Sequence, residues 1–338
     1  MTQAASTDQA TSTAAARIVV LAGGLSHERD VSLQSGRRVG EALRRRGLDV
    51  QVLDVGVGLL DTLRDDPPDC VLPLLHGETG ENGALREVLG LVGVPYVGSD
   101  PQACRLAFDK PVAKSLIARA GVRTPPWLAL PAETFRELGA AAIMAAVLTR
   151  LGLPLVVKPA RGGSALGCSV VRTEEELPAA MVACFAYDAV ALVERMVAGT
   201  EVAVTVLADP EPRALPPVEI RPDSGVYDYA ARYTAGATEF VVPAELSPTA
   251  AAACAEVAVT AHSTLGLRHL SRSDLLVDAD DHVWFLEVNV APGMTETSLV
   301  PLALDAAGLD VGAVHAGLAD DAIRSADKSL SQQVDKAV

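Results

Sequence analysis

The sequence of 338 residues has few basic residues, no paired cysteine motif and no long apolar run. It carries 28 lysines and arginines against 43 aspartates and glutamates, so the net charge is −15. A basic face for duplex DNA or for an anionic membrane is therefore not expected. The most apolar run, residues 139–148, is too short to cross a bilayer. We expect a cytoplasmic protein with no nucleic-acid or membrane partner.

The five cysteines form neither a Cys-x-x-Cys motif nor a cluster with histidine, and their number is odd. This pattern indicates reduced thiols and argues against a zinc site or a disulfide framework. Residues 1–16 are rich in Ala, Ser, Thr and Gln but lack the apolar core of a signal peptide, so we expect a disordered leader there.

Three common motifs of nucleotide-binding proteins and hydrolases are also missing. No Gly-x-Gly-x-x-Gly follows the first apolar strand, no Gly-Lys pair supplies a P-loop, and no Gly-x-Ser-x-Gly elbow is present. These absences argue against a dehydrogenase, a P-loop kinase and a serine hydrolase.

From Arg17 onward, apolar β-branched runs alternate with helical patterns. Strands separated by helices are typical of parallel βαβ units, so we expect an N-terminal α/β domain over residues 17–110. Its predicted strands are 17–22, 48–55 and 70–75, and its predicted helices are 31–46 and 84–91.

Two further units of mixed helix and strand are predicted, over residues 111–197 and 198–323. The first has predicted helices at 111–120 and 133–150, a capping box at 173–176 that opens a third helix, and strands at 155–158, 169–172 and 190–194. The second has a strand at 201–207, an irregular stretch at 221–240, a helix at 248–265 and a hairpin of strands 273–277 and 283–288. Residues 324–338 are predicted to be a frayed tail.

The predicted hairpin carries the strongest chemical pattern. Glu287 and Asn289 are two residues apart on a strand and so share a face, and a turn near 279–280 would place Asp274 opposite residues 285–287. Two carboxylates and an amide oxygen suit Mg²⁺, with nucleotide phosphates filling its other positions. The alternative is a surface hairpin with scattered acids. The flanking residues are apolar, however, and unpaired carboxylates beside them would cost several kcal/mol.

Arg272 lies two residues before Asp274, on the same face of its strand. Beside a metal site it could stabilise negative charge that develops on a transferred group. It could equally form a salt bridge that neutralises the acidic residues. The residues alone leave both roles open.

A Gly-rich loop, KPARGGSALG at 158–167, joins two predicted strands. Its backbone N–H groups could approach phosphates, with Lys158 as a point charge at the strand end. The alternative is an ordinary flexible hairpin. Only five of the 28 basic residues are lysines, and Lys158 ends an apolar strand, which favours phosphate contact.

Two more segments, GGLSHE at 23–28 and HGETGENG at 76–83, follow predicted parallel strands. Open α/β sheets bind ligands at the carboxyl ends of their strands, so together the segments indicate one small-molecule crevice. Taken singly, each could be a turn before a helix, with His76 merely capping. The other five histidines have no metal-like spacing and are expected to be structural or on the surface.

With these motifs, the chain resembles the D-alanine–D-alanine ligases of the ATP-grasp superfamily. The resemblance runs from about Arg17 to Leu318 through eight segments in order: GGLSHERDVSLQSG (23–36), LHGETGENG (75–83), PYVGSD (95–100), DK (109–110), VVKPARGGSALG (156–167), YDYAARY (227–233), SRSDL (271–275) and LEVNVAPGMTETSLVP (286–301). It implies a three-domain ATP-grasp fold of the α/β class, in which an N-terminal parallel-sheet domain precedes two α+β domains that grip ATP.

The resemblance also implies the residues that bind ATP and metal. The expected ATP ligands are Lys110 and Lys158 at the phosphates, Glu194 at the adenine amino group and Glu201 at the ribose, together with Arg195, Val197 and Arg232. Two Mg²⁺ ions, or Mn²⁺, are expected on Asp274, Glu287 and Asn289.

The remaining implied roles concern the amino-acid substrates. The ammonium of the first substrate is expected on Glu28, with His76 nearby, and the carboxylate of the second on Ser298 and Leu299. The oxyanion site would consist of Arg272 and the N–H of Gly293. A hydrogen-bonded set that ties the first domain to the mobile loops would consist of Glu28, Ser164 and Tyr233.

The implied activity is the ATP-dependent joining of two D-alanine molecules through an acyl phosphate, for peptidoglycan precursor synthesis, by a homodimer with residues 221–240 as a lid. Three residues depart from the family pattern: Arg232 replaces a lysine, Ala165 a serine and Val290 a threonine. One alternative is a related ligase that joins D-alanine to D-lactate or D-serine, or joins another amino acid in secondary metabolism. A second is a silent nucleotide-binding regulator, against which the complete Asp/Glu/Asn set argues.

Overall fold

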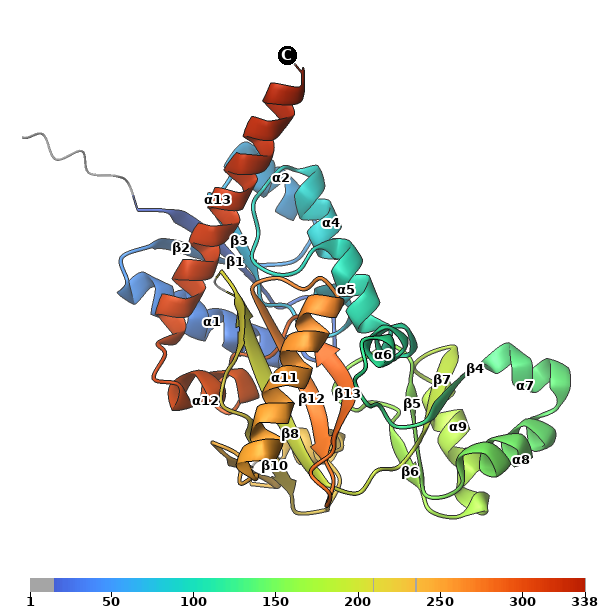
Figure 1. Cartoon of the computed structure of the whole chain (residues 1–338). Coiled ribbons are helices and arrows are strands. Elements are labelled where there is room, and N and C mark those ends of the chain that lie inside the picture. The colour runs from blue at the N-terminus through green and yellow to red at the C-terminus, as the bar shows by residue number, and fades with distance from the viewer. Residues whose placement is uncertain (1–14, 209, 235, 338) are drawn as a thin grey trace, which may run out of the picture.

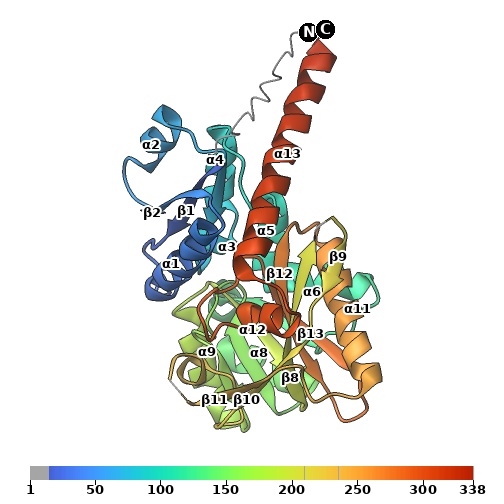
Figure 2. The ribbon, with the colours of Figure 1, turned by 90° about the vertical axis from the view of Figure 1, so that its left-hand side faces the viewer.

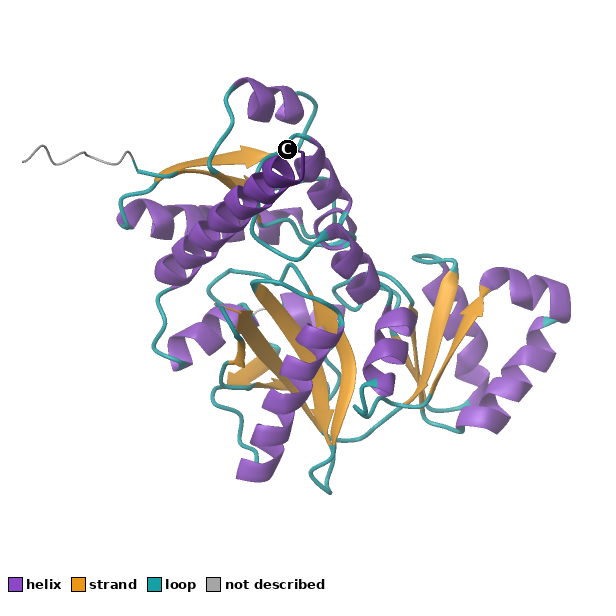
Figure 3. Ribbon diagram, turned by 45° about the horizontal axis from the view of Figure 1, so that its top comes forward, coloured by secondary structure: helices purple, strands orange, loops and turns teal. Residues whose placement is uncertain are grey.

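The computed structural model describes residues 15–208, 210–234 and 236–337. The predicted leader falls largely on residues 1–14, which lie outside the described part of the chain, as do the side chains of Tyr233 and of residues 329–337. The described residues form three sheets, each flanked by helices (Figures 1 and 3).

The N-terminal domain contains a parallel sheet of order β2-β1-β3, as the βαβ pattern predicts. Its strands are β1 (Arg17–Ala22), β2 (Asp49–Asp54) and β3 (Cys70–Pro73), and its helices are α1 (Arg29–Arg45), α2 (Leu59–Asp65), α3 (Glu78–Glu81), α4 (Ala84–Leu91) and α5 (Pro101–Phe108). β1 is apolar after its first residue and buried, as expected for a central strand covered on both faces. Because β1 and β3 are parallel neighbours, the segments 23–28 and 76–83 emerge at the same edge of this sheet.

The second unit contains an antiparallel sheet of order β4-β7-β5-β6 and projects to one side of the molecule (Figure 1). Its strands are β4 (Trp127–Pro131), β5 (Leu155–Pro159), β6 (Ser169–Val171) and β7 (Val190–Arg195), and its helices are α7 (Ala132–Leu138), α8 (Ala140–Leu151), the short 3-10 helix η1 (Glu174–Glu176) and α9 (Leu177–Phe185). The predicted capping box between Thr173 and Glu176 is present. The single helix predicted over 133–150 is wrong, because Gly139, at φ 87° and ψ 121°, separates α7 from α8.

The third unit contains a sheet of order β11-β10-β8-β12-β13, with β9 paired to β8. Its strands are β8 (Thr200–Ala208), β9 (Pro212–Ala214), β10 (Val218–Pro222), β11 (Thr238–Val241), β12 (Leu270–Val277) and β13 (Val283–Asn289). One face packs on α6 (Lys110–Arg119) and α11 (Pro248–Thr264), and the other packs on α12 (Leu299–Ala306). The stretch 221–240, predicted to be irregular, instead holds the end of β10, the short α10 (Tyr229–Tyr233) and most of β11.

The last helix, α13 (Val311–Ala337), extends along the first and third units (Figure 2). The prediction of a frayed tail over 324–338 is therefore wrong for residues 324–337, a stretch with no glycine or proline to end a helix. Leu318 and Ala322 of this helix join a core that also includes Ile18 of β1 and Ile220 of β10. The first and third units thus share one apolar core.

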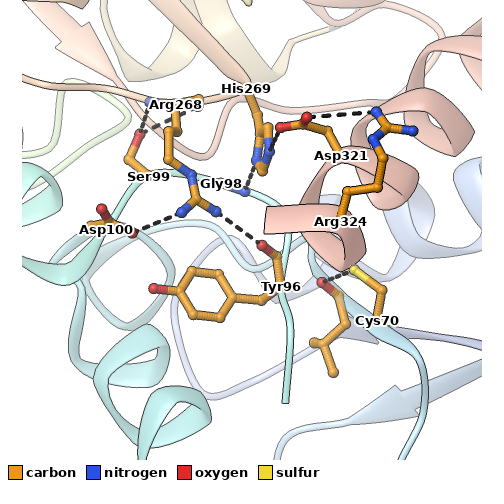
Figure 4. A network of polar contacts seen from close by, with 10 residues as sticks. Cys70, Tyr96, Gly98, Ser99, Asp100, Arg268, His269, Asp321 and Arg324 are labelled. Atoms are coloured by element: carbon orange, nitrogen blue, oxygen red, sulfur yellow. Dashed lines mark hydrogen bonds and ion pairs between the residues drawn. The ribbon is translucent and has the colours of Figure 1, made fainter. Parts of the chain in front are cut away.

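A polar network also joins these two units (Figure 4). The N–H of Gly98 donates to Nδ1 of His269 at 2.7 Å, and Arg268 pairs with Asp100 at 3.1 Å. Nε2 of His269 lies 3.3 Å from Asp321 on α13. The loop before α5, the two residues that precede β12 and α13 are therefore fixed against one another.

Within the described residues, no helix is by itself long and apolar enough to cross a membrane. The bent pair of α12 and residues 311–328, which meet at 102°, passes that test of length and composition only when its two parts are combined.

Candidate active site

Two cavities of similar size meet between the three units. The first has a volume of about 570 Å³ and lies between the sheet of the second unit and the sheet of the third. The second, of about 560 Å³, lies at the carboxyl edge of the N-terminal sheet. Their linings share Lys110, Gly162, Gly163, Tyr227, Arg232 and Glu287, so a molecule in one cavity would adjoin a molecule in the other.

All seven residues expected to bind ATP line the first cavity. Glu194, at the end of β7, is 2% exposed and lies between two lysines, with Lys114 at 2.5 Å and Lys158 at 2.6 Å. Burial opposes the charge of Glu194, but the two lysines outweigh burial and lower its pKa. The backbone from 195 to 199, between β7 and β8, completes this side of the cavity.

The hairpin of β12 and β13 forms the floor that the two cavities share, and the residue opposite Asp274 lies within the predicted range of 285–287. Asp274 is directly opposite Glu287, and Arg272 is directly opposite Asn289. A bulge between Asp274 and Leu275 shifts the register of the rest of the pair. Both carboxylates therefore come together across two neighbouring strands.

Arg272 holds Asp274 through two hydrogen bonds, Nε to Oδ1 at 2.7 Å and Nη2 to Oδ2 at 2.9 Å. Both side chains are buried. Of the two roles that the sequence leaves open for Arg272, the salt bridge is the arrangement present in this structure. The guanidinium also lines the second cavity, so it faces the space where a reacting group would lie.

The charges at this floor fit a divalent cation bound through oxygen. Burial opposes ionisation of Glu287, but Lys110, Lys158 and Arg232 outweigh it and lower its pKa to about 2, so the side chain is a carboxylate at neutral pH. Burial, opposed by Arg232 and assisted by the charges of Asp274 and Glu287, raises the pKa of the neighbouring Glu201 to about 7. Buried carboxylate and amide oxygens are the donors that Mg²⁺ prefers.

The residues expected to bind the amino-acid substrates line the second cavity. Ser164 donates a hydrogen bond to Oε1 of Glu28, which joins the Gly-rich loop of the second unit to the N-terminal domain. The third expected member of that set, Tyr233, ends α10, and its side chain lies outside the described residues.

His76 connects the N-terminal domain to the segment after β13. Its Nδ1 lies 2.8 Å from the carbonyl oxygen of Ala291, and its Nε2 lies 3.1 Å from Oγ of Ser35. Ser35 in turn accepts a hydrogen bond from the N–H of Met294 at 3.0 Å. Gly293 lies between these contacts, and a Cβ there would come within 2.8 Å of Oγ of Ser298.

Comparison with known proteins assigns this arrangement to a family. The family model described as "D-ala D-ala ligase C-terminus" matches residues 116–318. A D-alanine–D-alanine ligase from Pelotomaculum thermopropionicum is 38% identical over 294 residues, covering 87% of this chain and 92% of that protein. This chain belongs to the D-alanine–D-alanine ligase family.

Solved structures of ligases agree with this assignment. A D-alanine–D-alanine ligase from Bacillus anthracis complexed with ATP matches with a TM-score of 0.77 at 27% identity, over 93% of this chain and 99% of that one. A D-Ala:D-Ser ligase from Enterococcus faecalis matches with a TM-score of 0.77 at 28% identity, over 92% of this chain and 99% of that one. The predicted ATP-grasp fold, with a parallel-sheet domain before two α+β domains, is confirmed.

The three departures from the ligase family pattern have different surroundings. Arg232 lines both cavities, and its Cζ lies 4.2 Å from the ring centroid of Tyr227. Ala165 has a positive φ of 56° and lines the first cavity. Val290 is 5% exposed, packs in the core beneath β13, and has a methyl group where threonine has a hydroxyl.

Sequence reasoning assigns no role to Lys114 or to Glu81, although Lys114 pairs with Glu194 and Glu81 lines the second cavity. Lys114 is four residues after Lys110 on α6, on the same helix face, and the scarcity of lysine was a signal that could have found it. Glu81 lines the second cavity, and burial together with the charge of Glu28 raises its pKa to about 8. Its burial could not be foreseen in a segment that alternates glycine with polar residues.

Proposed function

We propose that this chain joins two D-alanine molecules to D-alanyl-D-alanine at the expense of ATP, in the synthesis of peptidoglycan precursors. The observation that carries the proposal is the pair of adjoining cavities whose linings share Lys110 and Glu287. One cavity holds the residues expected for ATP and the other holds those expected for the amino acids. A phosphate at the shared wall would lie next to a substrate carboxylate.

The reaction has two steps. First, a carboxylate oxygen of one D-alanine attacks the γ-phosphorus of ATP, the bond to the β-phosphate oxygen breaks, and ADP leaves. The product is an acyl phosphate. Next, the amine of the other D-alanine, having lost a proton, attacks the acyl carbon. A C–N bond forms, the bond from that carbon to the phosphate oxygen breaks, and phosphate leaves.

Cationic side chains at the shared wall support the first step. Lys110, Lys158 and Arg232 would offset the charge of the phosphates, and Lys114 would hold Glu194 in place at the adenine end. The expected ATP contacts of Glu201, Arg195 and Val197 belong to this proposal. Asp274, Glu287 and Asn289 would hold two Mg²⁺ ions, or Mn²⁺, which supply positive charge beside the phosphates.

The second cavity supports the acyl-transfer step. Glu28 would bind the ammonium of the first D-alanine, and Ser298 with Leu299 the carboxylate of the second. Arg272 and the N–H of Gly293 would stabilise the oxyanion of the tetrahedral intermediate. His76 would position the 291–294 segment through its contact with Ala291. Tyr233 would close the set with Glu28 and Ser164, and 221–240 would act as the lid that excludes water.

The domain bounds 17–110, 111–197 and 198–323 belong to the same proposal, as do a cytoplasmic location, a homodimeric assembly, and the absence of nucleic-acid and membrane partners.

A second candidate activity is the joining of D-alanine to D-serine, which the similarity to the Enterococcus faecalis D-Ala:D-Ser ligase favours. Ligation to D-lactate or of another amino acid is the third.

Competition between nucleophiles distinguishes these activities. The enzyme, with ATP and Mg²⁺, is offered equal concentrations of D-alanine, D-serine and D-lactate, and the products are quantified by mass spectrometry. We expect D-alanyl-D-alanine to predominate at neutral pH. A predominance of the mixed D-Ala-D-Ser product would assign the second activity instead.

A further inference from the structure

Arg86 is a buried arginine for which the described residues provide no acidic partner. The side chain lies on α4, is 2% exposed, and forms no ion pair with any described carboxylate. The nearest acids along the chain are bonded elsewhere, since Glu81 accepts from the N–H of Gly77 at 3.1 Å and Glu87 pairs with Arg105 at 2.9 Å. A buried positive charge without a counterion is strongly unfavourable.

The hydrogen-bonding groups of this guanidinium are only partly used. Nη1 donates to the carbonyl oxygen of Gly80, whereas Nε is buried and has no partner among the described residues. The guanidinium packs against the backbone of Gly98, where an added Cβ would lie 3.0 Å from Nε and 3.1 Å from Nη2. The edge of Arg86 that carries Nε and Nη2 therefore faces Gly98.

Arg86 and Gly98 line a small cavity of about 40 Å³ between the units. That volume is enough for about three water-sized occupants. The other lining residues come from the N-terminal sheet, from the segment that follows β13 and from α13, and they are mostly apolar: Leu72, Pro73, Leu74, Val97, Leu270, Val290, Ala291, Pro292, Met294, His315 and Leu318. No carboxylate among the described residues lines this cavity.

These observations specify the chemistry of an occupant. A negative charge is needed, because water would satisfy the free Nε–H but would leave the guanidinium charge uncompensated. A phosphate or carboxylate would need several donors, and the mostly apolar walls of this cavity provide few beyond Arg86. We propose that the cavity beside Arg86 binds one small monovalent anion of the halide class, chloride in the cell.

A bound anion in this cavity would stabilise the folded chain. Its walls join the first unit, the third unit and α13, so an occupant contacts all three. Residues Val290–Pro292 and Met294 flank Gly293, so the anion would support the segment on which that N–H is carried. Binding to the folded chain alone raises its stability by mass action.

Bromide locates such a site directly. Crystals of the full-length protein are grown in sodium bromide, and anomalous scattering is measured at the bromine edge. We expect a bromide peak in this cavity within about 3.5 Å of Nε of Arg86. A cavity that is empty or holds only water in those crystals would overturn the proposal.

Thermal unfolding in sodium chloride and in sodium gluconate at equal ionic strength tests the same site in solution. We expect Tm to rise with the logarithm of the chloride concentration above the dissociation constant, by about 2 °C or more in total. Arg86→Gln keeps a donor for the carbonyl of Gly80 and should abolish the rise. Arg105→Gln, which removes an exposed charge on neighbouring α5, should retain it.

An equal chloride effect in Arg86→Gln and in the wild type would show that the stabilisation is a general salt effect and that the proposal is wrong. Should Arg86→Gln fail to fold, the bromide experiment on the wild-type protein still decides the question.

Discussion

Lys110 and Glu287 form an ion pair, with Nζ and Oε2 3.1 Å apart, and both side chains line each of the two cavities. Lys110 also donates to the carbonyl oxygen of Gly162 at 2.6 Å, so the start of α6, the Gly-rich loop and β13 meet at one point. This point is the boundary between the proposed ATP site and the proposed amino-acid site. The charges there should matter more for turnover than for folding.

Replacing Glu287 tests the proposed metal site. Glu287→Gln keeps the shape of the side chain but removes the charge that faces Asp274 and Lys110. We expect turnover to fall by roughly 10²–10³-fold at saturating Mg²⁺, with little change in Tm. Glu256→Gln, which removes an exposed charge on α11, is the matched control. Near-normal turnover of Glu287→Gln would contradict the metal assignment.

The contact between Ser164 and Glu28 predicts a selective defect. Ser164→Ala removes a hydroxyl that donates to the carboxylate expected to bind the first ammonium. The loss of one such bond costs about 1–3 kcal/mol, which corresponds to a loss of kcat/KM for D-alanine of about 5- to 150-fold. The KM for ATP should change little. Ser115→Ala, whose hydroxyl bonds only within α6, is the control, and equal losses for both substrates would count against the assignment.

Arg232 replaces the lysine of the family pattern, and its position predicts that its positive charge, rather than its planar shape, is needed for activity. The guanidinium stacks on Tyr227 at 4.2 Å and lines both cavities. Arg232→Lys keeps the charge but not the planar group, so we expect activity within a few-fold of the wild type. Arg232→Ala should raise the KM for ATP and lower turnover. Arg213→Ala, at an exposed position, is the control. If Arg232→Ala left the KM for ATP and turnover unchanged, Arg232 would have no part in binding ATP.

The sequence predicts those parts of the site in which the contacting residues are close to each other along the chain. The facing of Asp274 and Glu287 follows from a short hairpin and strand periodicity, and the structure confirms it. The pairing of Lys110 with Glu287 joins segments from two different units, which no local pattern specifies. Lys114 and Glu81 were missed for the same reason, because their roles depend on burial by distant elements.

Errors in the fold have local causes. Gly139 interrupts a run of good helix formers, and its conformation at positive φ overrides their propensity. The final residues of the chain carry no stop signal, and they extend α13 whose earlier part packs on the shared core. The buried charge of Arg86 also escaped prediction, because α4 is amphipathic and a single arginine on it is ordinarily placed in solvent.

His269 predicts how stability depends on pH. Its imidazole faces Arg268, Asp321 and, more distantly, Asp100, and burial lowers its pKa from 6.5 to about 4. Above pH 6.5 the ring is neutral in the folded and unfolded chains, so this group adds no pH dependence. Between pH 6.5 and 4 only the unfolded chain takes up the proton. As the pH is lowered through this range, the free energy of unfolding should therefore fall by up to about 1.4 kcal/mol per pH unit.

Urea unfolding between pH 4.5 and 7.5 measures this dependence. His269→Asn tolerates the φ of 62° and keeps an acceptor for the N–H of Gly98, so it should reduce the slope below pH 6.5. His27→Asn, at an exposed position, should leave the slope as it is. An undiminished slope in His269→Asn would show that other groups account for the pH dependence.

The most direct test of the proposed ligase activity is the stoichiometry of one reaction. The purified protein is incubated with ATP, Mg²⁺ and D-alanine, and ADP, phosphate and D-alanyl-D-alanine are quantified together. We predict that the three products form in equal amounts, and that ADP release nearly stops when D-alanine or Mg²⁺ is omitted. Formation of AMP and pyrophosphate, or ADP release without dipeptide, would contradict the proposed activity.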